Sequence, residues 1–329
     1  MLLASQYKKA KPAKRIKVQD ENMSFEEFAD EFMLERIPIG IQMGTLKSVA
    51  MPLQQLNCVS LYFGNERGIS LIMGNLLYAM RREHSEIIIL KRIENSVFNS
   101  KDERLAKYIK DVTLFECTDD GLKNTLLYIE NAIARNKVFR NQYCDENGIG
   151  DWKNKEARKE WRKTVRKNTN PSMIIFESVS DFCITASTET AGTLSGYLQM
   201  CEGHNIYFWG AYYPDDEESI KKARFPEGIP EKDYEEGSAD SIREKRIRYN
   251  VEGMENSFNK DKFVIMAGGK FDKQKSIVLS PPWSEVTNKC SPQNDNKLLL
   301  NYHGNITSLY MPCGGANEQQ YDPDEQEII

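Results

Sequence analysis

The sequence is poor in the residues that build metal centres and lacks the spacing that builds disulfide frameworks. Its three histidines (His84, His204 and His303) are isolated, which argues against a histidine-based metal centre or a Ser-His-Asp triad. Its seven cysteines are an odd number, widely scattered and without a C-x-x-C pair. This pattern predicts reduced thiols and argues against a disulfide framework or a structural zinc site.

Long apolar runs are also missing. No uninterrupted apolar run of about 18 residues is present, so we expect no segment of this chain to span a bilayer. The opening Met-Leu-Leu-Ala is too short for a signal peptide, and lysines follow it. The net charge of −5 gives no global reason to bind nucleic acid or an anionic membrane. With 40% hydrophobic and 28% charged residues among 329, the composition is that of an ordinary globular protein with one large α/β domain or two smaller ones.

The most informative stretch runs from Val59 to Met80. An apolar strand over 59–63 ends in a turn bounded by Gly64 and Gly68, and apolar residues at helical spacing follow. Strand, glycine loop and helix in this order form the layout of a P-loop, in which backbone N–H groups and the helix N-terminus hold a polyphosphate. A working P-loop reads G-x-x-x-x-G-K-[ST]; its lysine contacts the phosphates and its hydroxyl holds Mg²⁺.

This loop departs from the working pattern at the positions that do the chemistry. The glycines are one residue closer together, Ile69 stands at the lysine position, and only the hydroxyl is kept, as Ser70. Glu66 adds a negative charge where a phosphate would sit. We therefore expect the scaffold of a nucleotide site without its cation.

A second stretch, 170–178, supplies the matching acidic position. The apolar run Met173–Phe176 predicts a buried strand, and it ends in Glu177, where a Walker B strand places its metal-linked acid. The next position, which holds a second acid in working enzymes, is Ser178. Asp181 lies one helical turn further on and is a candidate helix cap. A buried strand that ends in an acid is common, so the interpretation depends on its pairing with the glycine loop.

Alternating helix and strand patterns predict an α/β fold with a mostly parallel central sheet flanked by helices. A first helix is expected within 20–36, capped by Ser24 and striped by Phe25, Phe28 and Phe32; we favour packing of this stripe on the domain's own core over a partner-binding face. A hairpin over 37–53 follows. Further strands are expected over 86–90, 112–115, 205–214, 298–300 and 306–309, and a strand–Gly-Gly–strand pattern over 263–279. Further helices are expected over 105–109, 122–134 and 182–200.

Two segments rich in positive charge allow two interpretations each. Residues 1–19 carry six positive charges and no acid; we favour a solvated linker over a contact to phosphate or lipid headgroups. Residues 135–167 hold eleven basic and five acidic residues with Trp152 and Trp161. We favour a pair of solvated helices there over a surface that tracks a nucleic-acid backbone.

Two later segments are charged and poor in aliphatic residues. Residues 215–261 are expected to form a mobile surface segment with one helix near 241–249. The tail from Asn317 carries five acids, a composition typical of disorder.

The ordered combination of these features resembles the third, C-terminal ATPase-like domain of the EssC family. These proteins are the FtsK/SpoIIIE-type membrane ATPases of the type VIIb secretion system in Firmicutes. The resemblance spans roughly residues 35–315 and is carried by Ile-Pro-Ile-Gly40, the stretch 59–80, Pro-Ser-Met-Ile-Ile-Phe-Glu177, Ala-Gly-Gly-Lys-Phe-Asp-Lys-Gln274 and Leu-Tyr-Met-Pro-Cys313.

For fold and site, the resemblance implies a RecA-like P-loop NTPase fold with a degenerate nucleotide site. It assigns Gly64, Gly68, Ser70 and Glu177 as the positions of that site. ATP with Mg²⁺ is the cofactor of the family, whereas we expect no cofactor, no metal and no catalytic residue here. The domain boundaries expected on this basis are 1–35 for a linker and short helix from a preceding domain, 36–316 for the ATPase-like domain with charged insertions at 135–167 and 215–261, and 317–329 for an acidic tail.

For function, the resemblance implies a cytoplasmic module tethered through preceding ATPase domains of the same polypeptide to a membrane-bound secretion complex. Its partners would be secreted WXG100-type or LXG substrates, in an assembly taken to be hexameric. We expect a non-catalytic module that engages these substrates and couples them to active motor domains. The alternative is a weak or partner-completed ATP-hydrolysing motor, with Arg67 or an arginine of a neighbouring subunit as the missing cation. DNA translocation draws only on 135–167, so no nucleic-acid partner is expected.

Overall fold

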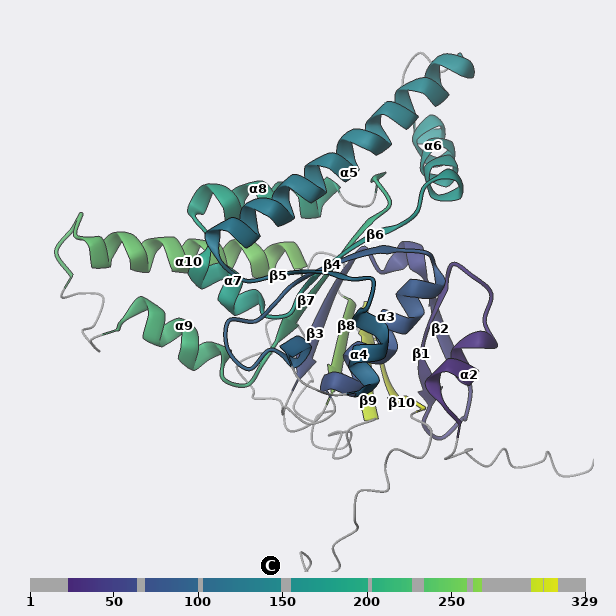
Figure 1. The fold of residues 1–329 in the computed structure, drawn as a ribbon, viewed down its shortest axis with the longest axis horizontal. Helices are drawn as coiled ribbons and strands as arrows, with labels where there is room; N and C mark the ends of the chain where they lie inside the picture. Colours follow the sequence, from purple (N-terminus) through teal and green to yellow (C-terminus); the bar gives the residue numbers. More distant parts are fainter. Residues whose placement is uncertain are drawn as a thin grey trace, which may run out of the picture.

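The computed structural model describes residues 23–63, 69–99, 103–148, 155–200, 203–226, 234–258, 263–267, 297–303 and 305–312. Within these residues a ten-stranded sheet runs through the middle of the molecule in the order β2-β1-β10-β9-β8-β3-β7-β6-β4-β5 (Figure 1). The strands are β1 (Arg36–Gln42), β2 (Ser48–Pro52), β3 (Cys58–Phe63), β4 (Glu86–Leu90), β5 (Thr113–Phe115), β6 (Ser172–Phe176), β7 (Ile206–Tyr212), β8 (Phe263–Ala267), β9 (Lys297–Tyr302) and β10 (Asn305–Tyr310).

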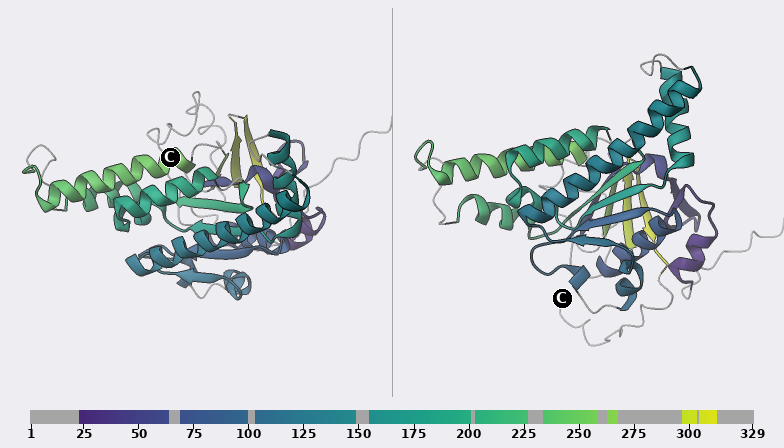
Figure 2. Two further views of the ribbon diagram at one scale, coloured as in Figure 1. Left: turned by 90° about the horizontal axis from the view of Figure 1, so that it is seen from above. Right: turned by 45° about the horizontal axis from the view of Figure 1, so that its top comes forward.

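Helices cover both faces of this sheet (Figures 1 and 2). They are α2 (Phe25–Asp30), α3 (Ile69–Arg82), α4 (Glu103–Ile109), α5 (Asp119–Glu146), α6 (Lys155–Asn168), α7 (Val179–Thr185), α8 (Thr188–Met200), α9 (Asp216–Arg224) and α10 (Ala239–Phe258), with short 3₁₀ turns η1 (Leu53–Gln55) and η2 (Val97–Asn99). One core cluster is shared by α2, α3 and α4 on one face, and the other by α5, α7, α8 and α10 on the opposite face.

The predicted mostly parallel α/β sheet is confirmed. Strands β8, β3, β7, β6, β4 and β5 run parallel to one another. Every residue of β6 and β7 is buried, as expected for strands covered on both faces. The remaining strands pair antiparallel, and β1 with β2 forms the predicted hairpin.

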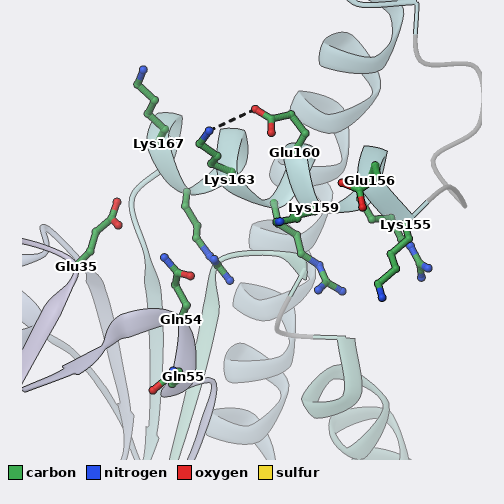
Figure 3. A pocket seen from close by; sticks show the side chains of 12 residues that line it. Glu35, Gln54, Gln55, Lys155, Glu156, Lys159, Glu160, Lys163 and Lys167 are labelled. Carbon is green, nitrogen blue, oxygen red and sulfur yellow. Dashed lines mark ion pairs between the residues drawn. The ribbon is translucent and has the colours of Figure 1, made fainter.

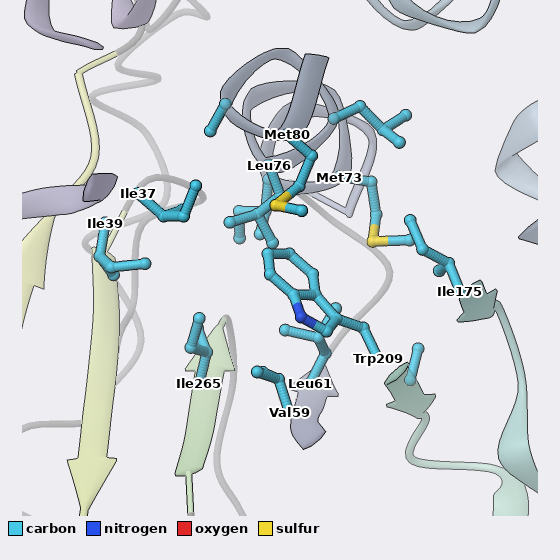
Figure 4. Packing of buried hydrophobic residues seen from close by; sticks show 14 of the residues in the cluster. Ile37, Ile39, Val59, Leu61, Met73, Leu76, Met80, Ile175, Trp209 and Ile265 are labelled. Carbon is cyan, nitrogen blue, oxygen red and sulfur yellow. The ribbon is translucent and has the colours of Figure 1, made fainter. Parts of the chain in front are cut away.

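The core on the α3 face is centred on Trp209 of β7. Figure 4 shows its indole ring between Met73 and Met80 of α3 and Leu61 of β3. The indole nitrogen donates to the carbonyl oxygen of Leu56 at 3.3 Å, so this buried side chain keeps its polar group paired. The contact joins β7 to the helix that follows β3.

Helix α2 begins as the sequence predicts. The Ser24 side chain accepts from the backbone N–H of Glu27, and the Glu27 carboxylate accepts from the backbone N–H of Ser24, which completes a capping box. Phe25 and Phe28 are buried in the core, and Phe32 packs against it in part. The phenylalanine stripe therefore packs on this chain's own core, as favoured. The predicted domain boundary between residues 35 and 36 stays a prediction.

The segment 215–261 differs most from expectation. It holds two helices, α9 and α10, that pack against each other, and α10 also packs against α7 and α8. Ile247, Met254 and Phe258 are buried on one side of α10. The prediction of a mobile surface segment with one short helix was wrong, because charged neighbours masked an apolar stripe at seven- and four-residue spacing.

The helix expected over 182–200 also differs: it is two helices. The chain is extended at Ala186, and the Ser187 hydroxyl accepts from the backbone N–H of Thr190, which starts α8 anew. The carbonyl oxygens of Cys183 and Ala186, left free at the end of α7, accept from the side-chain amide of Asn250 on α10.

In 135–167, α5 continues to Glu146 and α6 packs against it, which confirms a pair of helices. Trp161 is nevertheless buried and Val165 with it, so α6 is solvated on one side only. The predicted continuation of the strand from residue 268 to 279 lies outside the described residues, as do Trp152, residues 1–19 and the acidic tail.

We expect Phe258→Ala to lower the free energy of unfolding by about 3–5 kcal/mol. The Phe258 ring is fully buried, packs edge-on against Phe176, and lies so close to Gly210 that a Cβ there would meet it at 2.9 Å. Urea unfolding measures the change. The control Tyr249→Ala removes a ring of the same helix that is 55% exposed, and should stay within about 0.5 kcal/mol of wild type. Equal, small effects of both would contradict a packed α10.

Candidate functional site

The fold itself points to one edge of the sheet. Because β3, β7, β6 and β4 are parallel, their carboxyl ends meet there. The helix after β3, α3, packs on one face of the sheet, whereas α7 and α10, which follow β6 and β7, pack on the other. The chain therefore leaves the neighbouring strands β3 and β7 toward opposite faces of the sheet, which is the point where the direction of the connections reverses. In open α/β sheets, ligands bind outside the carboxyl ends at such a reversal.

The four predicted site positions are only partly described. Gly64 and Gly68 lie outside the described residues. Ser70 is the second residue of α3 and is half-buried. Glu177 directly follows β6, so it shares the carboxyl edge with the start of α3, but β7 lies between β3 and β6. The sheet therefore brings Ser70 and Glu177 to one edge without making them neighbours.

Ile69, at the lysine position of the loop, is turned into the protein. It is the first residue of α3, its exposed fraction is 2%, and it belongs to the core cluster on the α3 face. The side chain that begins the helix thus contributes to packing and offers no charge to an anion at the helix N-terminus.

Glu177 is fully buried and both of its carboxylate oxygens are hydrogen-bonded within the chain. Oε2 accepts from the backbone N–H of Arg92 at 2.8 Å and from the Ser96 hydroxyl at 2.6 Å. Oε1 accepts from the backbone N–H of Val97 at 2.7 Å. The carboxylate therefore organises the loop that follows β4.

The protonation of Glu177 is set by two opposing effects. Burial raises the pKa of the Glu177 carboxyl, while the hydrogen bonds from Ser96 and from the backbone of Arg92 and Val97 act in the opposite direction; the pKa is raised on balance. A carboxylate with this set of donors is suited to holding a loop, because its lone pairs already have partners.

The next two polar residues serve the same loop and the next helix. The Ser178 hydroxyl accepts from the backbone N–H of Asp181 at 3.0 Å and caps α7. The Asp181 carboxylate accepts from the backbone N–H of Ile93 at 2.7 Å. The prediction that Asp181 caps the helix was wrong: Ser178 is the cap, because it is the residue with extended backbone directly before α7.

Stacked aromatic rings lie at the carboxyl ends of β3 and β7, a feature that the sequence interpretation missed. Tyr62 stacks on Tyr212 with ring centroids 4.7 Å apart, and Phe63 stacks on Tyr213 at 5.6 Å. The first pair belongs to the core on the α10 face and the second to the core on the α3 face. The available signal was the occurrence of two consecutive aromatics at the ends of both strands. Burial raises the pKa of the Tyr212 and Tyr213 hydroxyls, so both stay neutral.

A cation does lie at this edge, but it is engaged. The Arg92 guanidinium is 4.2 Å from the centroid of the Tyr213 ring and pairs with the Asp215 carboxylate at 2.5 Å. Asp216 in turn accepts from the backbone N–H of Tyr213 at 2.7 Å. Arg92 thus joins the loop after β4 to the end of β7.

The described residues offer neither a metal-binding cluster nor a membrane-spanning helix. They contain no group of three or more histidine, cysteine, aspartate or glutamate side chains that could hold a metal ion. Among the helices described, none is long and apolar enough to cross a membrane. Within the same residues, Cys58, Cys117, Cys144 and Cys183 form no disulfide.

A scan of the sequence against models of known protein families finds no match, and a search of curated proteins finds none. Solved structures do match. The cytoplasmic domain of EssC is similar with a TM-score of 0.59 at 14% identity, over 95% of this chain and 51% of that one. ATPases 2 and 3 of EssC from Geobacillus thermodenitrificans give 0.56 at 12% identity, over 95% of this chain and 48% of that one. The chain therefore spans about half the length of these EssC structures.

A third similar structure is the conjugation coupling protein TcpA of pCW3, solved as a monomer with ATPγS. Its TM-score is 0.53 at 13% identity, over 93% of this chain and 73% of that one. At such identities the likeness concerns the fold alone. The chain has the α/β fold of P-loop ATPases, with a mostly parallel central sheet flanked by helices.

We expect Glu177→Gln to alter how stability depends on pH. Because the folded-state pKa of this carboxyl is raised, its contribution to stability is fully present below the unfolded-state pKa, near 4.5, and is lost as pH rises through the raised value. Glutamine removes that pH dependence. Its amide NH₂ also faces an N–H donor, which costs about 1–3 kcal/mol.

Urea unfolding between pH 4.5 and 8 tests this expectation, with Glu252→Gln on the exposed side of α10 as the control. The control should keep the wild-type pH profile. If Mg²⁺ stabilises the wild type and this stabilisation is lost in Glu177→Gln, Glu177 is a metal ligand and our interpretation is wrong.

Proposed function

We propose that this chain is a non-catalytic ATPase-fold module, equivalent to the third ATPase domain, of a type VII secretion coupling protein. In this proposal it acts on the cytoplasmic side of the membrane and engages secreted WXG100-type or LXG substrates. It couples them to active motor domains that precede it in the same polypeptide, within a hexamer. The fold likeness to EssC over 95% of the chain supports the choice of machine.

The side chains at the carboxyl ends of the strands support the non-catalytic part of the proposal. Stacked aromatic rings at the ends of β3 and β7 cover both faces of the sheet, Ile69 packs in the core, and both carboxylate oxygens of Glu177 accept hydrogen bonds. Phosphoryl transfer needs a cation at the β- and γ-phosphates and a metal-linked acid. The residues at these positions already have structural roles, and removal of such charge stabilisation costs several kcal/mol of transition-state energy.

A second candidate function is a weak motor completed by a partner. The observation in its favour is Ser70, which keeps a hydroxyl at the start of α3 and is half-buried rather than packed away. In that case a neighbouring subunit would supply the cation. The two functions differ in whether Mg-ATP binds to the assembled protein.

Calorimetry on the full cytoplasmic region distinguishes them. We expect heat of binding with purified WXG100-type substrates from the same organism, in about the micromolar range, which is typical of a transient interface that gains avidity in an oligomer. We expect Mg-ATP not to bind to this domain when the nucleotide sites of the preceding domains have been inactivated by mutation. Substrates that fail to bind would refute the proposal. Tight Mg-ATP binding that Ser70→Ala abolishes would favour the partner-completed motor.

Replacement of Ile69 by the lysine of a working P-loop gives a further prediction. Ile69→Lys should not create Mg-ATP binding, because the side chain at position 69 is buried in the core cluster. We expect it to destabilise the fold by more than Ile69→Val, which should cost about 0.5–1.5 kcal/mol. Thermal unfolding with and without Mg-ATP measures both effects. A stable Ile69→Lys protein that Mg-ATP stabilises would mean that the site lacks only its cation.

A further inference from the structure

A basic groove opens along α6, at the opposite edge of the sheet from the candidate nucleotide site. Helix α6 ends at Asn168, shortly before β6 begins, so the groove lies at the amino ends of the strands. Its volume is about 1180 Å³. Figure 3 shows Gln54 and Gln55 of η1 across from α6, and Lys167 pointing away from them.

Basic residues far outnumber acidic residues in α6. The helix carries seven basic residues against two acidic ones, an excess of five positive charges on a chain whose net charge is −5. All seven basic residues line the groove, among them the exposed Arg158 and Lys159. Lys163 pairs with Glu160 at 3.7 Å, but both side chains are more than half exposed, so this pair offsets little of the field. The groove therefore attracts an anion.

The side chains of α6 and of the groove help to decide between two classes of anionic ligand, nucleic acid and acidic polypeptide. Trp161 is 6% exposed and packs edge-on against His204, so its ring is not available for a base to stack on. The described residues that line the groove include no aromatic side chain. Single-stranded nucleic acids bind through basic grooves combined with stacking platforms, and the described lining of the groove holds no such platform.

A smaller pocket continues the groove at the end of α6. It has a volume of about 330 Å³, shares Glu35, Gln54, Arg166 and Lys167 with the groove, and is lined in addition by Leu34 and Glu83. The Leu34 side chain is 54% exposed, which offers an apolar contact at this end.

Glu83 forms part of the pocket wall. Its exposed fraction is 8%, and Oε2 accepts from the backbone N–H of Glu35 at 2.8 Å. Oε1 is buried and has no hydrogen-bond partner among the described residues. This oxygen is inaccessible, so a ligand in the pocket does not reach it, and burial raises the pKa of the Glu83 carboxyl. What the pocket offers a ligand is the exposed Leu34 side chain, a contact that suits an apolar side chain of a polypeptide and not a phosphate backbone.

We propose that the groove along α6, together with the pocket at Leu34 and Glu83, is a docking site for an acidic polypeptide segment. Acidic side chains of the segment pair with the basic residues of α6, and an apolar side chain contacts Leu34. The stretch from residue 155 to 167 extends about 18 Å, which matches a partner helix of about three turns. The inference does not depend on the proposed function, because it concerns the opposite edge of the sheet.

Fluorescence anisotropy on the full chain tests this proposal. The probe is a labelled 14-residue peptide with glutamates at helical spacing and leucines on the other face, in 50 mM salt. We expect binding that weakens steeply with salt, and weakens at least about tenfold in the double variant Arg158→Glu/Lys159→Glu. Leu34→Asp should also weaken binding, since it changes the apolar end of the site.

The matched control is Lys221→Glu/Lys222→Glu, which makes the same charge change on exposed lysines of α9, far from α6 in Figure 1. It should bind the peptide within about twofold of wild type. Circular dichroism verifies that the variants fold. The proposal is overturned if the peptide does not bind in 50 mM salt, or if the α9 and α6 variants lose affinity equally.

A 16-base-pair DNA duplex serves as the competing probe. Tighter binding of the duplex than of the peptide, dependent on Arg158 and Lys159, would identify the groove as a nucleic-acid site and overturn the polypeptide assignment. These outcomes are distinguishable from failure of the proposed function, because a WXG100-type substrate can fail to bind while the acidic peptide binds at α6, and the reverse.

Discussion

Burial of the parallel sheet on both faces is the constraint on which the rest of the structure depends. All residues of β6 and β7 are inaccessible, so the polar groups at the ends of these strands have to find partners inside the protein. Glu177 meets this demand with three donors from the loop after β4, and Asp181 with a fourth. The edge of the sheet becomes a fixed network.

That network has a direct consequence for anion binding. A phosphate site needs backbone N–H groups that point at the ligand. The N–H groups of Arg92, Ile93 and Val97 instead point at the chain's own carboxylates. The carboxylates occupy the position of an anion for that loop, and Arg92 is held by Asp215 and Tyr213. With stacked rings on both faces of the sheet, the described part of this edge is built for rigidity.

The amino edge of the sheet has the opposite character. It carries a groove with an excess of positive charge and, beside it, a pocket lined by the exposed Leu34 side chain. The net charge of −5 conceals this, because a global sum does not report where charges gather. Packing of Trp161 and Val165 against the protein is what turns the basic face of α6 outward.

The sequence by itself determined the elements whose signal is local. Period-two and period-3.6 patterns gave the parallel sheet, the hairpin of β1 and β2 and the cap at Ser24, because a residue's neighbours along the chain decide the burial of a strand or helix face. It also gave the departure at Ile69. The helix α10 was missed because its buried positions are diluted among charges.

Only the tertiary structure decided the state of the site. Glu177 bonds residues 80 to 85 positions away, and Tyr62 stacks on a ring 150 positions later. Neither pairing has a local signature, because strands adjacent in the sheet are distant in the chain. The sequence could place an acid at the end of β6; only the packing of β4 beside β6 decides that this acid binds a loop.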